Sequence, residues 1–593
     1  MSFAKISVRK GLSMLLTLML LASALAACSS GGNNDKSGEA QTPSSTSSGS
    51  SESPSADSSP PTKEPVTLTM FGAGAADIPG IQSDPVAKEI ERRTGVTLDT
   101  MAADENKLKL MLADGDLPDI LMVDHKYIKQ MIEGNQIINI DDYLKTSGQD
   151  IEKGMPETLE YFRQNMSEGQ NKLYFLPIHT GTYSDVGAAA PQYEYSVGFW
   201  TRWDMYQELG APEIKSTDDF LNLLAEMQKL YPKTEDGKKV YGVSAYNGGL
   251  WPFIIQNAFA DGYFNGPGTY VQDAQGNAYE LLTDESSTFW NSMRYFFKAN
   301  QMGLLDPEAF TQQMDQYSAK LDNLQLLSSI ANWWTGGGNK KLADAGKPEA
   351  GYGMIPITGT QIYKGGFSPT GWSGKYLAIS KNSKHPERAV ELLNFMFSPE
   401  GSRLAASGVE GEHWKMVDGK PEMTDETINL SKTMEKFGDT TGIGKYGNLQ
   451  GLDDFVVNPA DGELISLFYT PKVFQTKLTP LDKAYSEHYG ATYPGEALEK
   501  LVQEGKISWG AFDTTVQTGL ASAPDDIKRI DAKVEELVKT TMPKIILSKD
   551  EAEFNKVKEE FLDSLNKIGY DQSKQFWAQN WKDSLAKTAV LKR

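Results

Sequence analysis

The chain has 593 residues, a formal net charge of −21, an apolar fraction of 39% and one cysteine. A length above about 300 residues predicts more than one folding unit, because single hydrophobic cores stop growing near that size. The acidity disfavours a nucleic-acid partner, since phosphate binding needs a basic face. One cysteine excludes an intrachain disulfide and any cysteine-rich metal site.

The first 27 residues predict an export signal that is removed from the mature protein. Lys5, Arg9 and Lys10 precede an apolar run that ends at Ala27, and Cys28 follows it. This run is too short to be a stable membrane span. Its last three residues and Cys28 resemble the bacterial lipobox, which implies cleavage before Cys28 and attachment of lipid to its thiol. An ordinary secretory signal with a chance cysteine is the alternative interpretation.

Residues 28–65 predict a lipidated cysteine followed by a disordered tether. The stretch 29–65 has 13 serines among 37 residues and no large apolar side chain, so it cannot offset the entropy lost on ordering. Removal of the signal changes the net charge from −21 to −24, and such a surface is not attracted to anionic lipid. We therefore expect a monomeric globule on the extracytoplasmic face of the cell membrane, anchored through Cys28.

Strands and helices alternate from residue 66 onward. The patterns predict a strand at 66–71, a helix at 84–94, a strand at 96–98, a helix at 105–113 and a buried strand at 120–123. This order is typical of an α/β domain with a mostly parallel sheet. Further along, we expect strands at 173–176 and 240–243, helices at 217–229, 285–299 and 386–397, and a C-terminal helix with a capping box of Ser548 and Glu551.

The common motifs of nucleotide binding and hydrolysis are missing from the sequence. The five histidines have no spacing typical of metal ligands. We therefore expect no cofactor, no metal and no catalytic residues. A pair of catalytic carboxylates at the separation that a glycosidase needs leaves no trace in a sequence. An extracellular polysaccharide-active enzyme, either a glycosidase or a lyase, therefore stays an alternative.

Several segments resemble one protein family. Residues 112–120 resemble the Gly-Asp-x-Pro-Asp signature of extracellular solute-binding proteins that serve carbohydrate ABC importers. Residues 374–401 are similar to the strand, the proline-initiated helix and the Ser-Pro-Glu-Gly turn of the same family. Residues 408–414 and 554–586 resemble the large lipoprotein subgroup that includes alginate- and pectin-oligosaccharide-binding proteins.

The resemblance implies a two-lobed α/β fold of the type II periplasmic binding proteins, each lobe a mostly parallel sheet flanked by helices, with a helical C-terminal extension. We expect lobe 1 at 66–182 and about 366–415, lobe 2 at about 183–365 and parts of 416–540, and the C-terminal helices at about 541–593. It implies capture of an oligosaccharide in an interlobe cleft and delivery to the transmembrane subunits of an ABC permease. An oligopeptide-binding protein of similar architecture is a second alternative.

One loop departs from the family pattern. Alginate-binding members carry a calcium loop rich in Asp and Asn, whereas residues 231–239 of this chain contain three lysines and two carboxylates. Calcium prefers about six to eight oxygen ligands. We therefore expect no calcium at this loop.

Ligands of two-lobed binders lie at the carboxyl ends of strands, and sugar sites combine aromatic platforms with short polar side chains. Asp124 after the strand 120–123 is either a sugar ligand or a helix cap. If Trp333 and Trp334 lie on a strand they point in opposite directions, so we expect one of them to face ligand. For each tryptophan, core packing is the alternative. The expected ligand-binding residues are Asp124, His125, Tyr193, Tyr195, Trp200, Asn247, Trp251, Trp333, Trp334 and Trp372.

Cationic side chains would be needed if the ligand were a uronic acid. Lys126, Arg202, Lys364 and Lys375 are the residues that we consider for this role. The alternative for each is a solvated surface charge.

Overall fold

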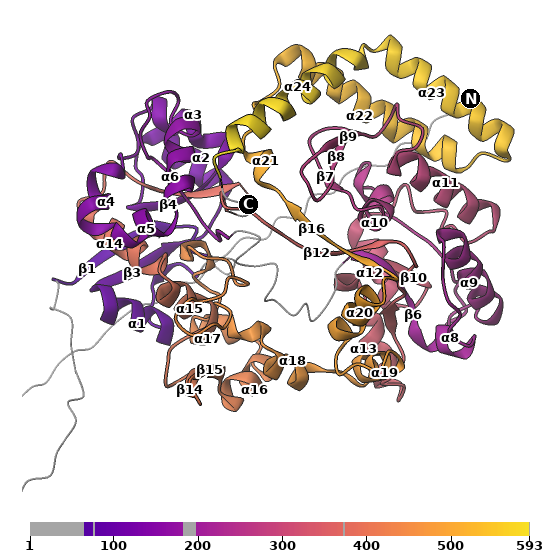
Figure 1. Ribbon diagram of the computed structural model, residues 1–593, viewed down its shortest axis with the longest axis horizontal. Coiled ribbons are helices and arrows are strands. Elements are labelled where there is room, and N and C mark those ends of the chain that lie inside the picture. The colour runs from indigo at the N-terminus through magenta and orange to yellow at the C-terminus, as the bar shows by residue number, and fades with distance from the viewer. Residues whose placement is uncertain (1–63, 75–77, 182–196, 372–373, 592–593) are drawn as a thin grey trace, which may run out of the picture. The chain divides into compact units, whose positions relative to one another are not determined.

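The computed structural model describes residues 64–74, 78–181, 197–371 and 374–591 (Figure 1). All of them belong to one compact unit, Pro60–Arg593. The expected export signal, the lipidated Cys28 and nearly all of the expected tether lie outside the described residues. Within the described ranges, every helix is too short or too polar to cross a membrane.

The first sheet runs in the order β2-β3-β1-β4-β13-β5. Its strands are β1 (Val66–Phe71), β2 (Gly80–Ile81), β3 (Val96–Met101), β4 (Ile120–Asp124), β5 (Leu176–Pro177) and β13 (Lys375–Ile379). β1 is parallel to β3 and β4, whereas β13 is antiparallel to β4 and β5. The first four residues of β4 are buried, as expected for an apolar run covered on both faces. We call the residues packed around this sheet the first lobe.

The helices that the sequence predicts at 84–94, 105–113 and 386–397 are present within one residue of the expected bounds. Asp84 caps α1 (Pro85–Thr94), and Gly115 ends α2 (Glu105–Asp114) in the left-handed conformation that glycine adopts without strain. The other helices are α3 (Ile128–Glu133), α4 (Asp141–Ser147), α5 (Gln149–Gly154), α6 (Pro156–Asn165), α14 (Pro386–Met396) and α15 (Pro399–Ser407). Their apolar faces form one core with the sheet.

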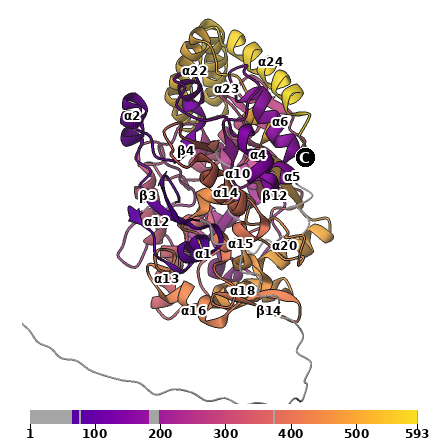
Figure 2. The same cartoon turned by 90° about the vertical axis from the view of Figure 1, so that its left-hand side faces the viewer.

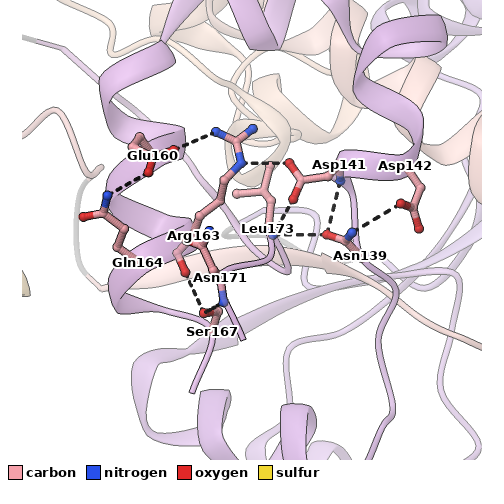
Figure 3. A network of polar contacts seen from close by, with 9 residues as sticks. All are labelled: Asn139, Asp141, Asp142, Glu160, Arg163, Gln164, Ser167, Asn171 and Leu173. Carbon is pink, nitrogen blue, oxygen red and sulfur yellow. Dashed lines mark hydrogen bonds and ion pairs between the residues drawn. The ribbon is translucent and has the colours of Figure 1, made fainter. Parts of the chain in front are cut away.

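A polar network joins α4 and α6 to the segment before β5 (Figure 3). The Asp141 carboxylate accepts hydrogen bonds from Arg163 Nε at 2.8 Å and from the Leu173 backbone N–H at 3.0 Å. Asn139 Oδ1 accepts a second bond from the Leu173 N–H at 3.1 Å. Asp142, the next residue of α4, is exposed. Within this network its carboxylate accepts one hydrogen bond, from the side-chain amide of Asn139.

The second sheet runs in the order β10-β6-β11, with β6 (Val197–Arg202) between β10 (Ser328–Ala331) and β11 (Tyr352–Met354). β6 is antiparallel to both neighbours, so the prediction of a mostly parallel sheet in each lobe is wrong for these strands. The connection between β6 and β10 is long enough for either strand direction, so the alternation of strands and helices in the sequence does not decide it. The expected strand at 240–243 is reduced to parallel bridges from Tyr241 to Leu326 and from Val243 to Leu305.

Helices pack around the second sheet and form the second core, and we call this part the second lobe. Ser216 caps α9 (Thr217–Leu230), and Ser287 caps α11 (Thr288–Gln301). The remaining elements are α8 (Trp203–Glu208), α10 (Trp251–Ala260), α12 (Met314–Asp322), α13 (Gly336–Asp344), α19 (Pro480–His488), α20 (Pro494–Gln503) and the small sheet of β7 (Phe264–Asn265), β8 (Tyr270–Gln272) and β9 (Ala278–Glu280).

Two strands far apart in the sequence, β12 (Gln361–Phe367) and β16 (Ser508–Asp513), pair in parallel and lie side by side (Figure 1). β12 precedes the return of the chain to the first sheet at β13. The following segment contains β14 (Trp414–Val417), β15 (Lys420–Met423), α16 (Asp425–Thr433), α17 (Phe437–Thr441) and α18 (Pro471–Lys477). Within it, Tyr446 and Leu449 are part of the first core.

The C-terminal helices α22 (Asp525–Ile546), α23 (Glu551–Lys567) and α24 (Tyr570–Thr588) follow the short α21 (Thr515–Thr518) and lie next to one another (Figures 1 and 2). Phe554 and Phe561 of α23 are buried in the second core. The predicted capping box of Ser548 and Glu551 is wrong. Asp550 caps α23 by accepting the Glu553 N–H at 2.9 Å, because aspartate is an equally good N-cap closer to the helix, and Ser548 donates to the Lys544 carbonyl.

Residues 450–453 form backbone hydrogen bonds with Thr180, close to the point where the first segment of the first lobe ends. The Thr180 N–H donates to the Gly451 carbonyl at 2.8 Å, and the Asp453 N–H donates to the Thr180 carbonyl at 3.0 Å. Loss of hydration raises the pKa of the Asp453 carboxyl to about 7. The hydrogen bond from the Phe455 N–H acts to lower this pKa, and the negative charge of Asp454 acts to raise it further.

Replacement of Asp141 by alanine should lower the free energy of unfolding by about 1–3 kcal/mol, because it leaves the Leu173 N–H and the Arg163 guanidinium without this acceptor. Asp142→Ala is the matched control. It removes a carboxylate from the same first helical turn and should cost less than about 0.5 kcal/mol. Urea unfolding measures both variants, and equal losses would contradict the assigned role of Asp141.

The raised pKa of Asp453 predicts a pH-dependent stability. Because the folded pKa lies above the ordinary value of 3.8, the contribution of Asp453 is fully present below pH 4 and is lost as the pH rises through 7. Asp453→Asn cannot titrate at this position. The unfolding free energy of the natural chain should therefore fall relative to that of the variant between pH 5 and about pH 8. A constant difference over that range would refute the assigned pKa.

Candidate functional site

Aromatic side chains gather where β10 ends in the second lobe. The short 3-10 helix Asn332–Trp334 follows β10 directly, α10 begins at Trp251, and Tyr246 follows the segment that bridges to Leu305. Trp251 and Trp334 pack against the same small apolar cluster around Phe259. We call Tyr246, Trp251, Trp333 and Trp334 the aromatic cluster.

Ring contacts fix this arrangement. The ring centroids of Trp333 and Trp334 are 5.2 Å apart, and Trp334 meets Tyr246 at 5.7 Å and Tyr317 of α12 at 5.3 Å. Burial raises the pKa of Tyr246, and it raises that of Tyr317 to about 12. Both hydroxyls are therefore neutral at physiological pH and can take part in hydrogen bonds as phenols.

The members of the cluster differ in exposure. Trp333 is 54% exposed, whereas Trp251 and Trp334 are half-buried. Asn247, the next residue after Tyr246, is exposed, and its backbone N–H donates to the Gln312 carbonyl at 2.8 Å. Met314, at the first turn of α12, is 52% exposed. Exposed apolar surface beside a polar side chain is the composition of a ligand-binding surface.

Asp124 and His125 lie at the end of β4 in the first lobe, and both are exposed. Asp124 Oδ1 accepts the Lys126 N–H at 3.1 Å, so this residue does cap the short helix that follows. The His125 ring meets Tyr376 edge-on at 6.2 Å. Desolvation lowers the pKa of His125, although Asp124 and Glu168 oppose this effect, so the imidazole is neutral at pH 7.

The cations at this edge have acidic neighbours. Lys126 forms an ion pair with Glu105 at 3.0 Å. Hydrogen bonds from Lys109, Lys126 and Tyr127 lower the pKa of Glu105 to about 2, which keeps this carboxylate ionised. Lys375 of β13 stands opposite Asp124 in the strand register.

The structure places Trp200 apart from the exposed residues. This side chain lies on β6, is 9% exposed and lines a cavity of about 390 Å³ together with residues of β11, α13, α19 and α20. Its indole nitrogen is buried and has no hydrogen-bond acceptor in the part of the chain that the structure describes. Arg202, the last residue of β6, is buried and paired with Asp204 at 2.6 Å.

Other predicted residues are not placed. Tyr193, Tyr195 and Trp372 lie outside the described residues, and the same holds for the side chain of Lys364. Across the described ranges, no group of three or more His, Cys, Asp or Glu side chains could hold a metal ion. In the loop that departs from the family pattern, Asp236 is paired with Lys238 at 3.0 Å.

Sequence reasoning missed Tyr246 and Met314. Tyr246 directly precedes Asn247, which the sequence does single out. Its place three residues after the predicted strand 240–243 was the available signal. Met314 comes from α12, and no motif marks it. The bond between Asn247 and Gln312, two residues before Met314, is a tertiary contact that the sequence does not reveal.

Solved structures similar to this chain share its fold. An HMO-binding, ABC-transporter-associated solute-binding protein from Bifidobacterium longum infantis has 13% identity and a TM-score of 0.55, and the match covers 88% of this chain and 99% of that chain. The S. pneumoniae ABC-transporter substrate-binding protein FusA, in complex with kestose, has 16% identity and a TM-score of 0.53, with 88% and 100% covered. The alginate-binding protein AlgQ2 has 16% identity and a TM-score of 0.50, with 88% and 99% covered.

At these identities the likeness establishes the fold alone. The predicted fold class, the two-lobed α/β fold of type II periplasmic binding proteins, is confirmed. A curated relative, an uncharacterized protein in the butB 5' region of Niallia circulans, is 26% identical over 144 residues, which is 23% of this chain and 56% of that protein. Residues 83–403, more than half of the chain, match the bacterial extracellular solute-binding proteins, and the chain belongs to this family.

Proposed function

We propose that the chain is the substrate-binding lipoprotein of an ABC importer. It captures an oligosaccharide between its two lobes and delivers it to the transmembrane subunits of the permease without altering it chemically. Lipid on Cys28 holds the monomeric protein at the extracytoplasmic face of the cell membrane. Membership of a solute-binding family and the lipobox-like residues before Cys28 support this proposal.

The exposed Trp333 is the observation that carries the proposal. A sugar ring has an apolar face, and an aromatic ring is the surface that packs on it. Trp333 presents such a surface while its neighbour Trp334 anchors it to Tyr246 and Tyr317. The exposed amide of Asn247 offers a donor and an acceptor to sugar hydroxyls.

Residues of the first lobe complete the proposed site. Asp124 is the last residue of β4 and His125 follows it, at the carboxyl edge of the sheet where ligands of α/β proteins bind. In our proposal these two side chains meet the sugar when the lobes close. A ligand that contacts both lobes favours the closed state, and a shift from 1:99 to 99:1 requires about 5.5 kcal/mol of differential binding. The permease then recognises the closed protein.

A thermal-shift panel tests the proposed function. The mature chain is incubated with xylotriose, cellotriose, mannotriose, trigalacturonate and a tripeptide. A trisaccharide present at about 100 times its dissociation constant should stabilise the protein by about 2.7 kcal/mol. Stabilisation by the tripeptide alone would sink the sugar hypothesis in favour of a peptide binder. Product formation from a bound trisaccharide, followed by chromatography, would instead establish an enzyme.

Trp333→Ala should weaken binding of the responding trisaccharide by about 30-fold, because loss of a central aromatic contact costs about 2 kcal/mol. Its melting temperature should stay close to that of the natural chain, since the side chain is exposed. Tyr231→Ala removes an exposed aromatic at the end of α9 and serves as the matched control. Calorimetric titration measures both affinities. Equal affinities of the two variants would remove Trp333 from the site.

A further inference from the structure

A half-buried ion pair joins α12 to a loop that is hydrogen-bonded to the segment before Tyr246 of the aromatic cluster. Asp306 is 0% exposed, and its Oδ2 accepts hydrogen bonds from Lys320 Nζ at 2.6 Å and from Ser244 Oγ at 2.8 Å. Lys320 also reaches Glu308 at 2.7 Å. Burial acts to lower the pKa of Lys320, but the bonds to Asp306 and Glu308 outweigh it and raise the pKa. Lys320 therefore stays protonated at physiological pH.

Gln312 extends this contact toward the proposed sugar site. Its side-chain amide donates to the Ala245 carbonyl at 2.5 Å and to Ser244 Oγ at 2.8 Å. Its backbone carbonyl accepts the Asn247 N–H at 2.8 Å. The chain from Ser244 to Asn247 is thus held on both sides of Tyr246 by the loop that begins at Asp306.

Lys320 connects the same network to α12. It lies three residues after Tyr317 on this helix, so the two side chains leave from neighbouring positions. The Tyr317 ring meets Tyr246 at 5.8 Å and Trp334 at 5.3 Å. The ion pair and the ring contacts therefore join the same two segments, α12 and the stretch before Asn247, at separate points.

Stability alone is a poor explanation for such a pair. Removing two charges from water costs several kcal/mol per ion, and apolar residues of similar volume often serve stability equally well. Directional bonds, in contrast, fix the relative position of the groups that they join. Lys320 of α12 and Ser244 reach the Asp306 carboxylate from two separate segments, and the Glu308 N–H of its own loop donates to it as well. A purely apolar contact would not define the register of these segments.

We propose that the Asp306–Lys320 ion pair is a positioning device that holds Tyr246 and Asn247 in the geometry in which they bind sugar. The inference rests on the proposed function, because it assigns these two residues to the ligand site. Asp306 and Lys320 do not touch the ligand in this proposal. They act through Ser244, Gln312 and Tyr317.

The test neutralises the pair while keeping its volume, with the double variant Asp306→Asn/Lys320→Met in the mature chain. The matched control is Arg202→Met/Asp204→Asn, which removes an ion pair of the same lobe at the other end of β6. Both doubles avoid the uncompensated buried charge of a single variant. Melting temperatures of the two doubles should fall by similar amounts.

Two measurements follow. The protein is labelled with 5-fluorotryptophan, and the ¹⁹F resonance of Trp334 is assigned with the variant Trp334→Phe. This resonance should shift or broaden in Asp306→Asn/Lys320→Met and stay unchanged in the control variant. The affinity for the trisaccharide of the panel that stabilises the natural chain most should fall about tenfold in the first double alone.

The outcomes separate this inference from the proposed function. An unchanged Trp334 resonance in Asp306→Asn/Lys320→Met overturns the positioning role, whether or not any trisaccharide binds. Equal loss of affinity in both doubles also overturns it, because the effect would then follow general destabilisation. A changed resonance in a protein that binds none of the panel sugars refutes the sugar site while the local coupling stands.

Discussion

The pairing of β13 with β4 determines how the rest of the chain is arranged. Both strands are buried, and their antiparallel register runs from Lys375 opposite Asp124 to Ile379 opposite Ile120. Asp119, just before β4, reinforces the junction. Its carboxylate accepts the Thr69 N–H at 2.8 Å, the Thr69 hydroxyl at 2.7 Å and the Ser383 hydroxyl at 2.6 Å. One carboxylate thus ties β1, β4 and the chain after β13 together.

Because β13 returns to the first sheet, the residues between β5 and β13 must leave that sheet and come back. This excursion builds its own core around β6, β10 and β11. The first residue of β6, Val197, pairs with Ala331 at the end of β10. Asn332, Trp333 and Trp334 follow Ala331 in the chain, so the aromatic cluster lies at the edge of the second sheet where β6 begins. In the proposed function this is the edge from which the ligand is captured.

Local sequence signals predicted much of the fold. Asp84, Ser216 and Gly115 act within a few residues of their own position, so their roles at helix ends could be inferred from sequence. Ser548 and Asp550 compete for the same role, and the choice between them depends on the backbone. Strand direction in the second sheet could not be inferred, because the long connection between β6 and β10 allows either direction.

The candidate site was only partly predictable for the same reason. Asn247, Trp251, Trp333 and Trp334 follow apolar runs, which marked them in the sequence. Trp200 has the same residue type and a similar setting, yet the structure places it in the core, because exposure is decided by the surrounding helices. Asp306 and Lys320 have no sequence signal at all. Their meeting depends on a loop and a helix that come together only in the folded lobe.

The central claim is that a sugar ring packs on the aromatic cluster. A crystal structure of the mature chain grown with the trisaccharide that stabilises it most tests this claim directly. We expect a sugar ring stacked on Trp333, a hydroxyl hydrogen-bonded to the Asn247 amide, and Asp124 or His125 in contact with the same trisaccharide. A trisaccharide bound elsewhere, with Trp333 still in contact with solvent, would contradict the account.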